Sequence, residues 1–329
     1  MFLYLLKLGN NKTKLNQMKI LSFAFFFLSI LAISCTPTTD ETVNPNTTDK
    51  KIRFQFKFDE NQTRLGALGQ PAEIPEGNAA QTPDFQKLSV HVIDMTPNRF
   101  TPYGQGFLAY KGAETTTGGA NAVDFDKAII EDENNIFLEL PLSDIEPGTY
   151  EYARVSVSFQ QYKVKFNINN VPQVGDLEGQ MATVASFLGF NNYIGDVQVR
   201  DQTLSVNDDK LQGFWAFETD LTAPWSSYNQ LYSGESPAGA TTVVNPLAGD
   251  SDIPAGSCVV TGAFTEPLII TGEEVDDVLV TLSFSINESF EWKDLNGNGE
   301  LDFYVDDASQ NEQIVDMGLR GLVASWEEN

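Results

Sequence analysis

Hydrophobic and polar residues alternate with a period of two along most of this 329-residue chain. Such alternation is typical of β-strands that bury one face and expose the other. Three segments show it clearly, IRFQFKF, IFLELPL and VLVTLSFSI, with predicted buried rows at Ile52–Phe58, Ile136–Leu142 and Val278–Ile286. A slip of one residue would turn each whole row toward solvent, so the pattern specifies the register of these strands.

The segment from Tyr150 to Ile168 alternates as well, but the apolar row changes parity twice, near Ala153–Arg154 and near Gln160–Gln161. One extra residue at each place would restore a single inward face, so we expect two β-bulges, or one bulge and a hairpin turn. No long 3.6-residue period occurs, and the connecting segments are rich in Gly, Pro, Asn and Thr. The pattern therefore predicts an all-β chain, folded as a sandwich or barrel with long loops.

The first 34 residues differ from the rest of the chain. Four lysines supply all their charge, and an uncharged apolar run, ILSFAFFFLSILAIS, follows at residues 20–34. This run is shorter than the roughly 20 residues that a membrane-spanning helix needs. A basic start followed by a short apolar stretch is typical of a secretory signal peptide, and Met18 is an alternative start of the same signal.

The apolar run ends at Cys35, in the sequence LAISC. These residues resemble the lipobox of bacterial lipoproteins, whose cysteine is acylated and becomes the mature N-terminus. Residues 35–51 are rich in Thr, Asp, Asn and Pro, the composition of a flexible tether. We therefore expect a lipid anchor at Cys35 and a β-sandwich domain over residues 52–329, either undivided or in two halves that meet near 170–180. The alternative is an ordinary secretory signal with a cysteine at its cleavage site.

Charge and cysteine content restrict the partners of this exported domain. Without the four lysines of the signal, 16 basic residues remain against 46 acidic residues, a net charge of −30. Such a surface repels nucleic acid and suits divalent cations, although acidity by itself also keeps an exported protein soluble. Once Cys35 is acylated, Cys258 is the remaining thiol, and we expect it to be buried and inert. The single histidine, His91, falls on the polar face of its predicted strand and is expected to be partly exposed.

The sequence DLNGNGELD at residues 294–302 spaces oxygen-bearing side chains as a calcium loop does, at positions 1, 3, 5 and 9, with glycine at position 6. The predicted ligands are the side chains of Asp294, Asn296, Asn298, Asp302 and Asp306 and the backbone carbonyl of Glu300. The Asn-Gly pairs are equally typical of a tight β-hairpin turn, which we expect in either case. A bare turn needs neither Asp294 nor Asp302, which favours a structural calcium site with an affinity on the order of 10⁻⁴ to 10⁻³ M.

A family resemblance rests on FQKLSVHVIDM, on LELPLSDIEPGTYEYARVSVSF with its PGTY element at 147–150, and on the C-terminal SINESFEWKDLNGNGELDF. This arrangement resembles β-sandwich envelope lipoproteins of the Bacteroidota, including MbnP-like domains. The resemblance implies an immunoglobulin-like or transthyretin-like sandwich in the cell envelope, as an outer-membrane lipoprotein on the periplasmic or the outer surface. It carries over no copper ligand, because copper sites need histidine, methionine or thiolate and these are scarce here.

Three functions follow as hypotheses. The first is a binding or accessory module for a glycan or an envelope protein, with Trp225, Tyr228 and Tyr232 as candidates for stacking on a sugar. These aromatic residues lie in the long segment 219–252 and have the alternative role of packing on the core. The second is a glycoside hydrolase with two carboxylates, for which Glu218 and Asp220 are the pair beside an aromatic cluster. The third is copper or metal handling of the MbnP type.

Overall fold

The structure is a computed structural model that describes residues 50–103, 105–236, 245, 247–250 and 253–329. All of these residues belong to one compact unit, Asn46–Asn329. The predicted signal peptide, Cys35 and the tether as far as residue 49 lie outside the described residues. Nearly all regular structure in the unit is β-strand, and no helix in the described part is long and apolar enough to cross a membrane.

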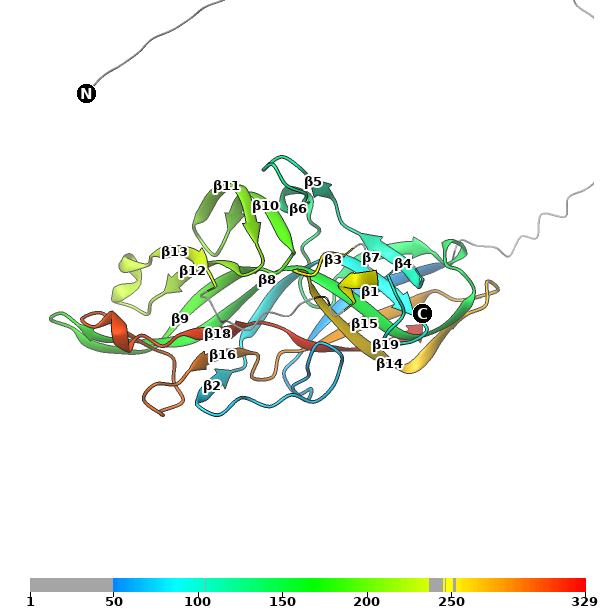
Figure 1. Cartoon of the computed structure of the whole chain (residues 1–329). Helices are drawn as coiled ribbons and strands as arrows, with labels where there is room; N and C mark the ends of the chain where they lie inside the picture. The colour runs from blue at the N-terminus through cyan, green and yellow to red at the C-terminus, as the bar shows by residue number, and fades with distance from the viewer. Residues whose placement is uncertain (1–49, 104, 237–244, 246, 251–252) are drawn as a thin grey trace, which may run out of the picture. The chain divides into compact units, whose positions relative to one another are not determined.

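One large sheet contains twelve strands (Figure 1). Its main path runs in the order β13-β12-β9-β8-β14-β19-β15-β1-β7, with β17 and β3 attached to β8 and β4 attached to β3. The bounds are β1 Lys51–Asp59, β3 Asp84–Thr96, β4 Phe107–Lys111, β7 Ile136–Pro141, β8 Gly148–Val171, β9 Gly175–Phe187, β12 Phe214–Asp220, β13 Leu231–Glu235, β14 Cys258–Ile270, β15 Val278–Ser285, β17 Asp302–Tyr304 and β19 Arg320–Glu328.

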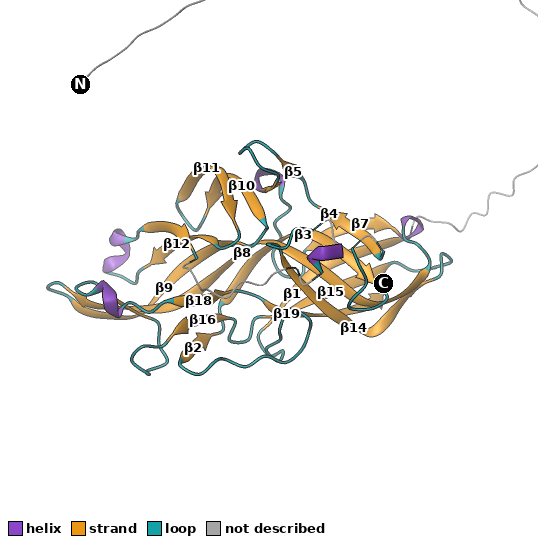
Figure 2. Ribbon diagram, viewed as in Figure 1, coloured by secondary structure: helices purple, strands orange, loops and turns teal. Residues whose placement is uncertain are grey.

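Two smaller sheets accompany it, with strand orders β11-β10-β6-β5 and β18-β16-β2. Short 3₁₀ turns punctuate the connections (Figure 2). The remaining bounds are β2 Asn78–Gln81, β5 Glu114–Thr115, β6 Ala122–Asp124, β10 Asn191–Gln198, β11 Thr203–Leu211, β16 Phe290–Lys293, β18 Ile314–Met317, η1 Phe125–Lys127, η2 Leu142–Asp144, η3 Trp225–Tyr228, η4 Ala248–Asp250 and η5 Ala308–Gln310. The sheets form a β-sandwich-like fold, which confirms the predicted all-β class.

The three one-sided strands predicted from the sequence are all present, and one of them has a bulge near the start of its buried row. β1 and β15 lie side by side in parallel, in register from Ile52 opposite Val278 onward, and their apolar rows are buried as expected. In β7 the predicted row holds except at its first residue, because Leu138 and Leu140 pack on the core and Leu142 is buried. Ile136 is 43% exposed, whereas Phe137 is buried against Phe56, with 4.9 Å between ring centroids. The pairing with β1 shifts register between Phe54 and Gln55, which leaves Phe137 as a bulged residue that turns inward.

The bent strand predicted from the parity changes is β8, a single strand of 24 residues at the centre of the large sheet. Its pairing is irregular between Tyr150 and Tyr152 and again at Ser158, a few residues from the predicted bulges. Because of the extra residue at Ser158, the side chains of Val157 and Phe159 pack in two different core clusters. Residues 170–180, where the sequence suggested a division, comprise the end of β8, the turn that follows it and the start of β9.

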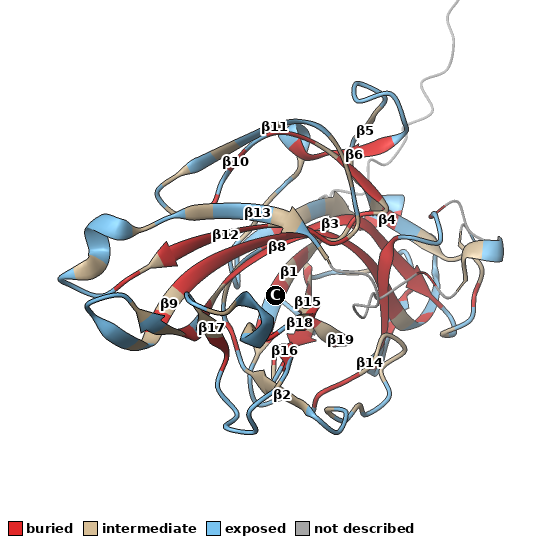
Figure 3. Cartoon of the chain, turned by 60° about the vertical axis from the view of Figure 1, so that its left-hand side comes forward, coloured by how far each residue is buried: buried red, intermediate tan, exposed pale blue. Residues whose placement is uncertain are grey.

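Burial follows the strands closely, as Figure 3 shows for β8, β9 and their neighbours. Clusters of buried apolar side chains from residues 52–324 fill the space between the layers. The unit therefore contains its own core, as a domain that folds by itself does. Cys258 is buried, as predicted, and burial raises the pKa of its thiol to about 12. His91 contradicts the prediction of partial exposure, since it is 2% exposed and its Nε2 lies 3.0 Å from Oε1 of Glu114.

Candidate functional site

The loop between β16 and β17 is folded around its own side chains. The carboxylate of Asp294 accepts hydrogen bonds from the backbone N–H groups of Gly297 and Gly299, at 2.7 and 3.0 Å. Both glycines have positive φ, 75° and 74°, a conformation that glycine adopts without steric cost. The sequence DLNGNG therefore forms a tight succession of turns that begins at Asp294.

Asp302 ends this loop and is the centre of a cluster of amides. The side chain is 2% exposed, although the loop around it is open to solvent. Its oxygens accept hydrogen bonds from four asparagine Nδ2 atoms: Asn167 at 3.0 Å, Asn169 at 2.9 Å, Asn296 at 2.8 Å and Asn298 at 2.8 Å. Burial by itself raises the pKa of Asp302, but the four amide donors outweigh it and hold that pKa below its usual value. Asp302 is therefore an ionised carboxylate, and it ties the loop to β8.

Glu312, which sequence reasoning missed, closes the loop from the other side. Its Oε1 accepts a hydrogen bond from the backbone N–H of Leu295, and its Oε2 accepts one from that of Asp302, both at 2.9 Å. Burial raises the pKa of Glu312, and the two backbone donors oppose this rise. Glu312 is ten residues beyond Asp302 in the chain, outside the spacing of the loop, so the sequence carried no signal for this role.

The predicted β-hairpin at this loop is wrong. β16 pairs with β18 on one side and β2 on the other, whereas β17 pairs in parallel with β8 at Asn167–Asn169. Both edges of β16 are already occupied, so the loop crosses from the small sheet to the large one. The Asn-Gly pairs thus form turns in a loop that connects two sheets, and they do not join two neighbouring strands of one sheet.

The predicted calcium ligands are only partly brought together. The side chains of Asp294, Asn296, Asn298 and Asp302 share the loop, whereas Asp306 accepts a hydrogen bond from Asn170 Nδ2 at 2.9 Å. The carboxylate of Glu300 accepts from Asn167 Nδ2 at 2.7 Å. Among the described residues, no group of three or more His, Cys, Asp and Glu side chains is placed to hold a metal ion.

The loop residues nevertheless fit a hard cation chemically, because every donor is a carboxylate, an amide or a backbone carbonyl. Asn296 and Asn298 direct Nδ2 at Asp302, while their Oδ1 atoms accept the N–H groups of Asn298 and Glu300 at 2.9 and 2.8 Å. Rotation of each amide by half a turn would direct oxygen at the same place, at the cost of the two backbone hydrogen bonds that the Oδ1 atoms now accept. An ion would then replace the two amide donors beside Asp302.

The three aromatic residues predicted to bind a sugar do not form one platform. Trp225 and Tyr228 lie in η3, with ring centroids 6.3 Å apart, and Trp225 packs on the core between the layers. Tyr228 is 64% exposed. Tyr232 belongs to β13, a strand inside the segment that the sequence suggested was a loop, and it lies opposite Phe217 of β12. The structure thus separates Tyr232 from the other two.

Tyr232 lines an apolar pocket of about 460 Å³. The large sheet contributes residues of β8, β12, β13 and β17, and the other residues come from β18 and the segment between β17 and β18. The lining residues are Phe166, Ile168, Trp215, Phe217, Thr219, Tyr232, Phe303, Tyr304, Val305, Asn311, Ile314 and Met317. The pocket is therefore a part of the space between the layers that side chains leave unfilled at one end.

Phe166 forms the base of this pocket. It is 4% exposed, and its ring packs at 5.4 Å from Phe217 and 5.9 Å from Phe303, between centroids. Toward the rim, exposure rises to 53% at Tyr232 and 55% at Val305. Apolar side chains that remain in contact with solvent in a concave site are the usual sign of a place where a ligand binds. Apart from Tyr232 these residues escaped prediction, and the aromatic sequence GFWAF was the only signal for them.

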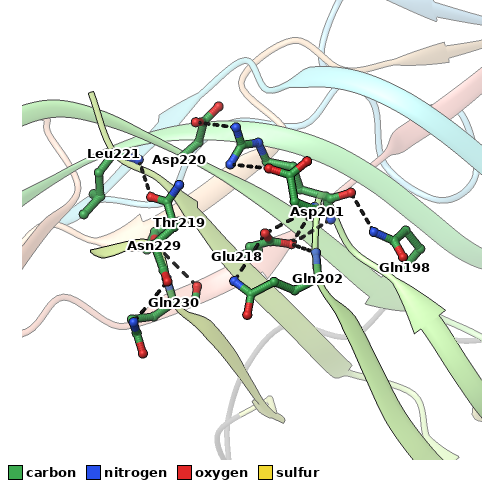
Figure 4. Close-up of polar contacts among 10 residues, drawn as sticks. Gln198, Asp201, Gln202, Glu218, Thr219, Asp220, Leu221, Asn229 and Gln230 are labelled. Atoms are coloured by element: carbon green, nitrogen blue, oxygen red, sulfur yellow. Dashed lines mark hydrogen bonds and ion pairs between the residues drawn. The ribbon is translucent and has the colours of Figure 1, made fainter. Parts of the chain in front are cut away.

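Glu218 and Asp220, the pair considered for hydrolysis, are both engaged in internal contacts (Figure 4). Glu218 is 1% exposed. Its carboxylate accepts hydrogen bonds from the backbone N–H groups of residues 200, 201 and 202, at 2.9 to 3.2 Å. Asp220 forms an ion pair with Arg200, with 2.9 Å between Oδ1 and Nη2. Both carboxylates thus hold the turn between β10 and β11 against β12.

Comparison with known proteins adds no relative. The chain matches no protein-family model, and neither a curated protein nor a solved structure is significantly similar to it. The geometry of the pocket and of the loop beside it is therefore the basis for an inference about function.

Proposed function

We propose that this chain is a lipid-anchored protein of the cell envelope whose β-sandwich is a binding module, with its ligand site in the pocket between the layers. The observation that carries this function is the solvent-accessible apolar lining of that pocket, from buried Phe166 to exposed Tyr232 and Val305. Burial of such a surface by a ligand is favourable at roughly 25 cal/mol per Å². The secretory signal, the lipobox cysteine Cys35 and the resemblance to Bacteroidota lipoproteins support the location.

The position of the pocket suits a tethered module. β1 begins at Lys51, whose backbone N–H donates to Oδ1 of Asp277 at 3.1 Å, and Asp277 exchanges backbone hydrogen bonds with the C-terminal Asn329. Both ends of the described chain thus meet at one place, on the right in Figure 1, while β12, β13 and η5 lie at the left. The predicted tether therefore joins the unit at Lys51, at the end that lies away from β12 and β13.

The loop at 294–302 has a structural role in this proposal. It leads directly into β17, and Phe303, Tyr304 and Val305 form part of the pocket wall. A calcium ion held by Asp294, Asn296, Asn298, Asp302 and the carbonyl of Glu300 would fix the start of this wall. The ion would supply rigidity, while the chain itself supplies the binding surface.

A neutral environment-sensitive dye, N-phenyl-1-naphthylamine, tests whether the pocket accepts a ligand. We expect the chain from Thr36 onward to bind it saturably with one site, and Val305→Asp to weaken binding at least tenfold by placing a charge at the rim. Val275→Asp is the matched control, because Val275 is 76% exposed and lies outside the pocket. Absence of saturable binding, or an equal loss in both variants, would refute the proposed site.

A further inference from the structure

The pocket is lined mainly by apolar side chains, and two of its few polar groups are already hydrogen-bonded. No lining residue carries a charge. Oδ1 of Asn311 accepts the backbone N–H of Tyr304 at 2.6 Å, and Oγ1 of Thr219 accepts that of Gln230 at 2.8 Å. A sugar carries many hydroxyl groups, and most of those that entered this mainly apolar pocket would lose hydrogen bonds to water without replacing them, which is unfavourable. The lining therefore selects for a ligand whose buried part is apolar.

The shape and size of the pocket restrict the ligand further. Its walls belong to two packed layers, and stacked sheets lie about 10 Å apart, so the pocket is about one side chain thick. Its volume of about 460 Å³ lies within the usual range of small-molecule sites. A methylene group takes up about as much space as a water molecule, about 30 Å³, so on the order of fifteen carbon atoms fill the pocket.

The chain around the pocket is acidic and has no basic residue in the two segments that form most of its walls. Residues 294–319 contain seven Asp and Glu and no Lys or Arg, and residues 212–236 contain three acids and no base. Asp306 and Asp307 directly follow Val305 at the rim. The nearest bases on β8, Lys163 and Lys165, alternate with Val164 and Phe166 and so face away from the pocket. This surface repels an anionic head group.

We infer that the ligand inserts one alkyl or acyl chain between the layers and carries an uncharged or cationic head group outside the rim. This inference rests on the proposed function, because it names the ligand class of the same pocket. The apolar chain contacts Phe166, Phe217 and Phe303, and the head group remains in water near Val305. The length of the alkyl chain determines the affinity, and the acidic residues at the rim select against an anionic head group.

The test is a titration of the chain from Thr36 onward with monoacylglycerols of 8, 10 and 12 carbons, below their micelle concentrations, followed by tryptophan fluorescence. We expect roughly fifteenfold tighter binding for each two added methylenes, because each buried methylene contributes a factor of about four. Dodecyltrimethylammonium should bind at least as tightly as the neutral C12 compound, and laurate at least tenfold more weakly. Val305→Lys should reduce this difference between laurate and the cation, whereas the control Val275→Lys should leave it unchanged.

Three results would overturn the inference: affinity that does not change with chain length, laurate that binds as tightly as the cation, or binding of maltooligosaccharides or planar polycyclic aromatics in place of the monoacylglycerols. Saturable binding of the naphthylamine dye together with any of these results would remove only the ligand class and leave the proposed site intact. Failure of the dye and of all amphiphiles would remove the proposed function itself. Val275 and Val305 are exposed, so both pairs of variants should fold.

Discussion

The clearest test of the loop at the pocket wall is the substitution Asp302→Ala. This side chain accepts hydrogen bonds from four asparagine amides, and hydrogen bonds to a charged group contribute about 1.5–3 kcal/mol each. Asn296 and Asn298 are exposed and will bind water instead, and Asn167 keeps its bond to Glu300. We therefore expect a loss well below the sum of four bonds, about 3 kcal/mol of unfolding free energy.

The assay is urea and thermal unfolding of the chain from Thr36 onward in EDTA, followed by circular dichroism. A loss of about 3 kcal/mol corresponds to a decrease of about 6–12 °C in the unfolding temperature of a domain of this size. Asp306→Ala is the matched control, because Asp306 is an exposed carboxylate with one hydrogen bond, to Asn170, and should change stability by less than about 0.5 kcal/mol. A change below about 1 kcal/mol in Asp302→Ala, or an equal loss in the control, would show that the amide cluster does not order this loop.

Four other changes have defined outcomes. Calcium at about 5 mM should stabilise the chain by about 1–2 kcal/mol relative to EDTA if its affinity is near 10⁻³ to 10⁻⁴ M, and Asp294→Asn should abolish that increment; an unchanged increment in the melt would exclude the loop as the site. Burial raises the pKa of Asp316 to about 6 in the folded state, above the usual 3.8, so folding takes up a proton between these pH values. The unfolding free energy should therefore fall as the pH rises from about 4 to about 6. Asp316→Asn should make this dependence on pH shallower. Cys35→Ser should remove labelling by radioactive palmitate and release the protein from the membrane fraction, and persistent labelling would point to another acylation site. Gly262→Ala should lower the unfolding temperature by several degrees, since a Cβ there would lie 2.1 Å from the carbonyl oxygen of Leu322; an unchanged melt would contradict this packing.

Sequence periodicity predicted the central strands well, because a strand buried on one face must alternate. β1 and β15 bury the rows expected of them. In β7 Leu138 and Leu140 face the core as expected, but a bulge at Phe137 exposes Ile136, and the period does not show where a bulge falls.

The local turns of the loop at 294–302 could be predicted from the sequence, but its contacts with β8 could not. Spacing alone indicated Asp294, Asn296, Asn298 and Asp302, and the structure places these four in one loop. Asn167 and Asn169 reach Asp302 because β17 pairs in parallel with β8, more than 130 residues earlier in the chain. Period and spacing carry no information about such a distant pairing.

The pocket was the least predictable feature for the same reason. Its base combines Phe166, Phe217 and Phe303, each of which reads in the sequence as an ordinary inward residue of its strand. Only the packing of three distant segments shows that they enclose a space that side chains do not fill. The sequence indicated the aromatic residues of segment 219–252 as the binding site instead, and of Trp225, Tyr228 and Tyr232 only Tyr232 lines the pocket.

The most direct test of the binding function is native mass spectrometry of the chain purified without detergent from the periplasm of cells that secrete it unacylated. We predict a bound small molecule at one copy per chain, present on the unsubstituted protein and on Val275→Asp and absent from Val305→Asp. A protein that carries no ligand, or one that keeps its ligand after Val305→Asp, would contradict the assignment of the pocket between the layers as the binding site.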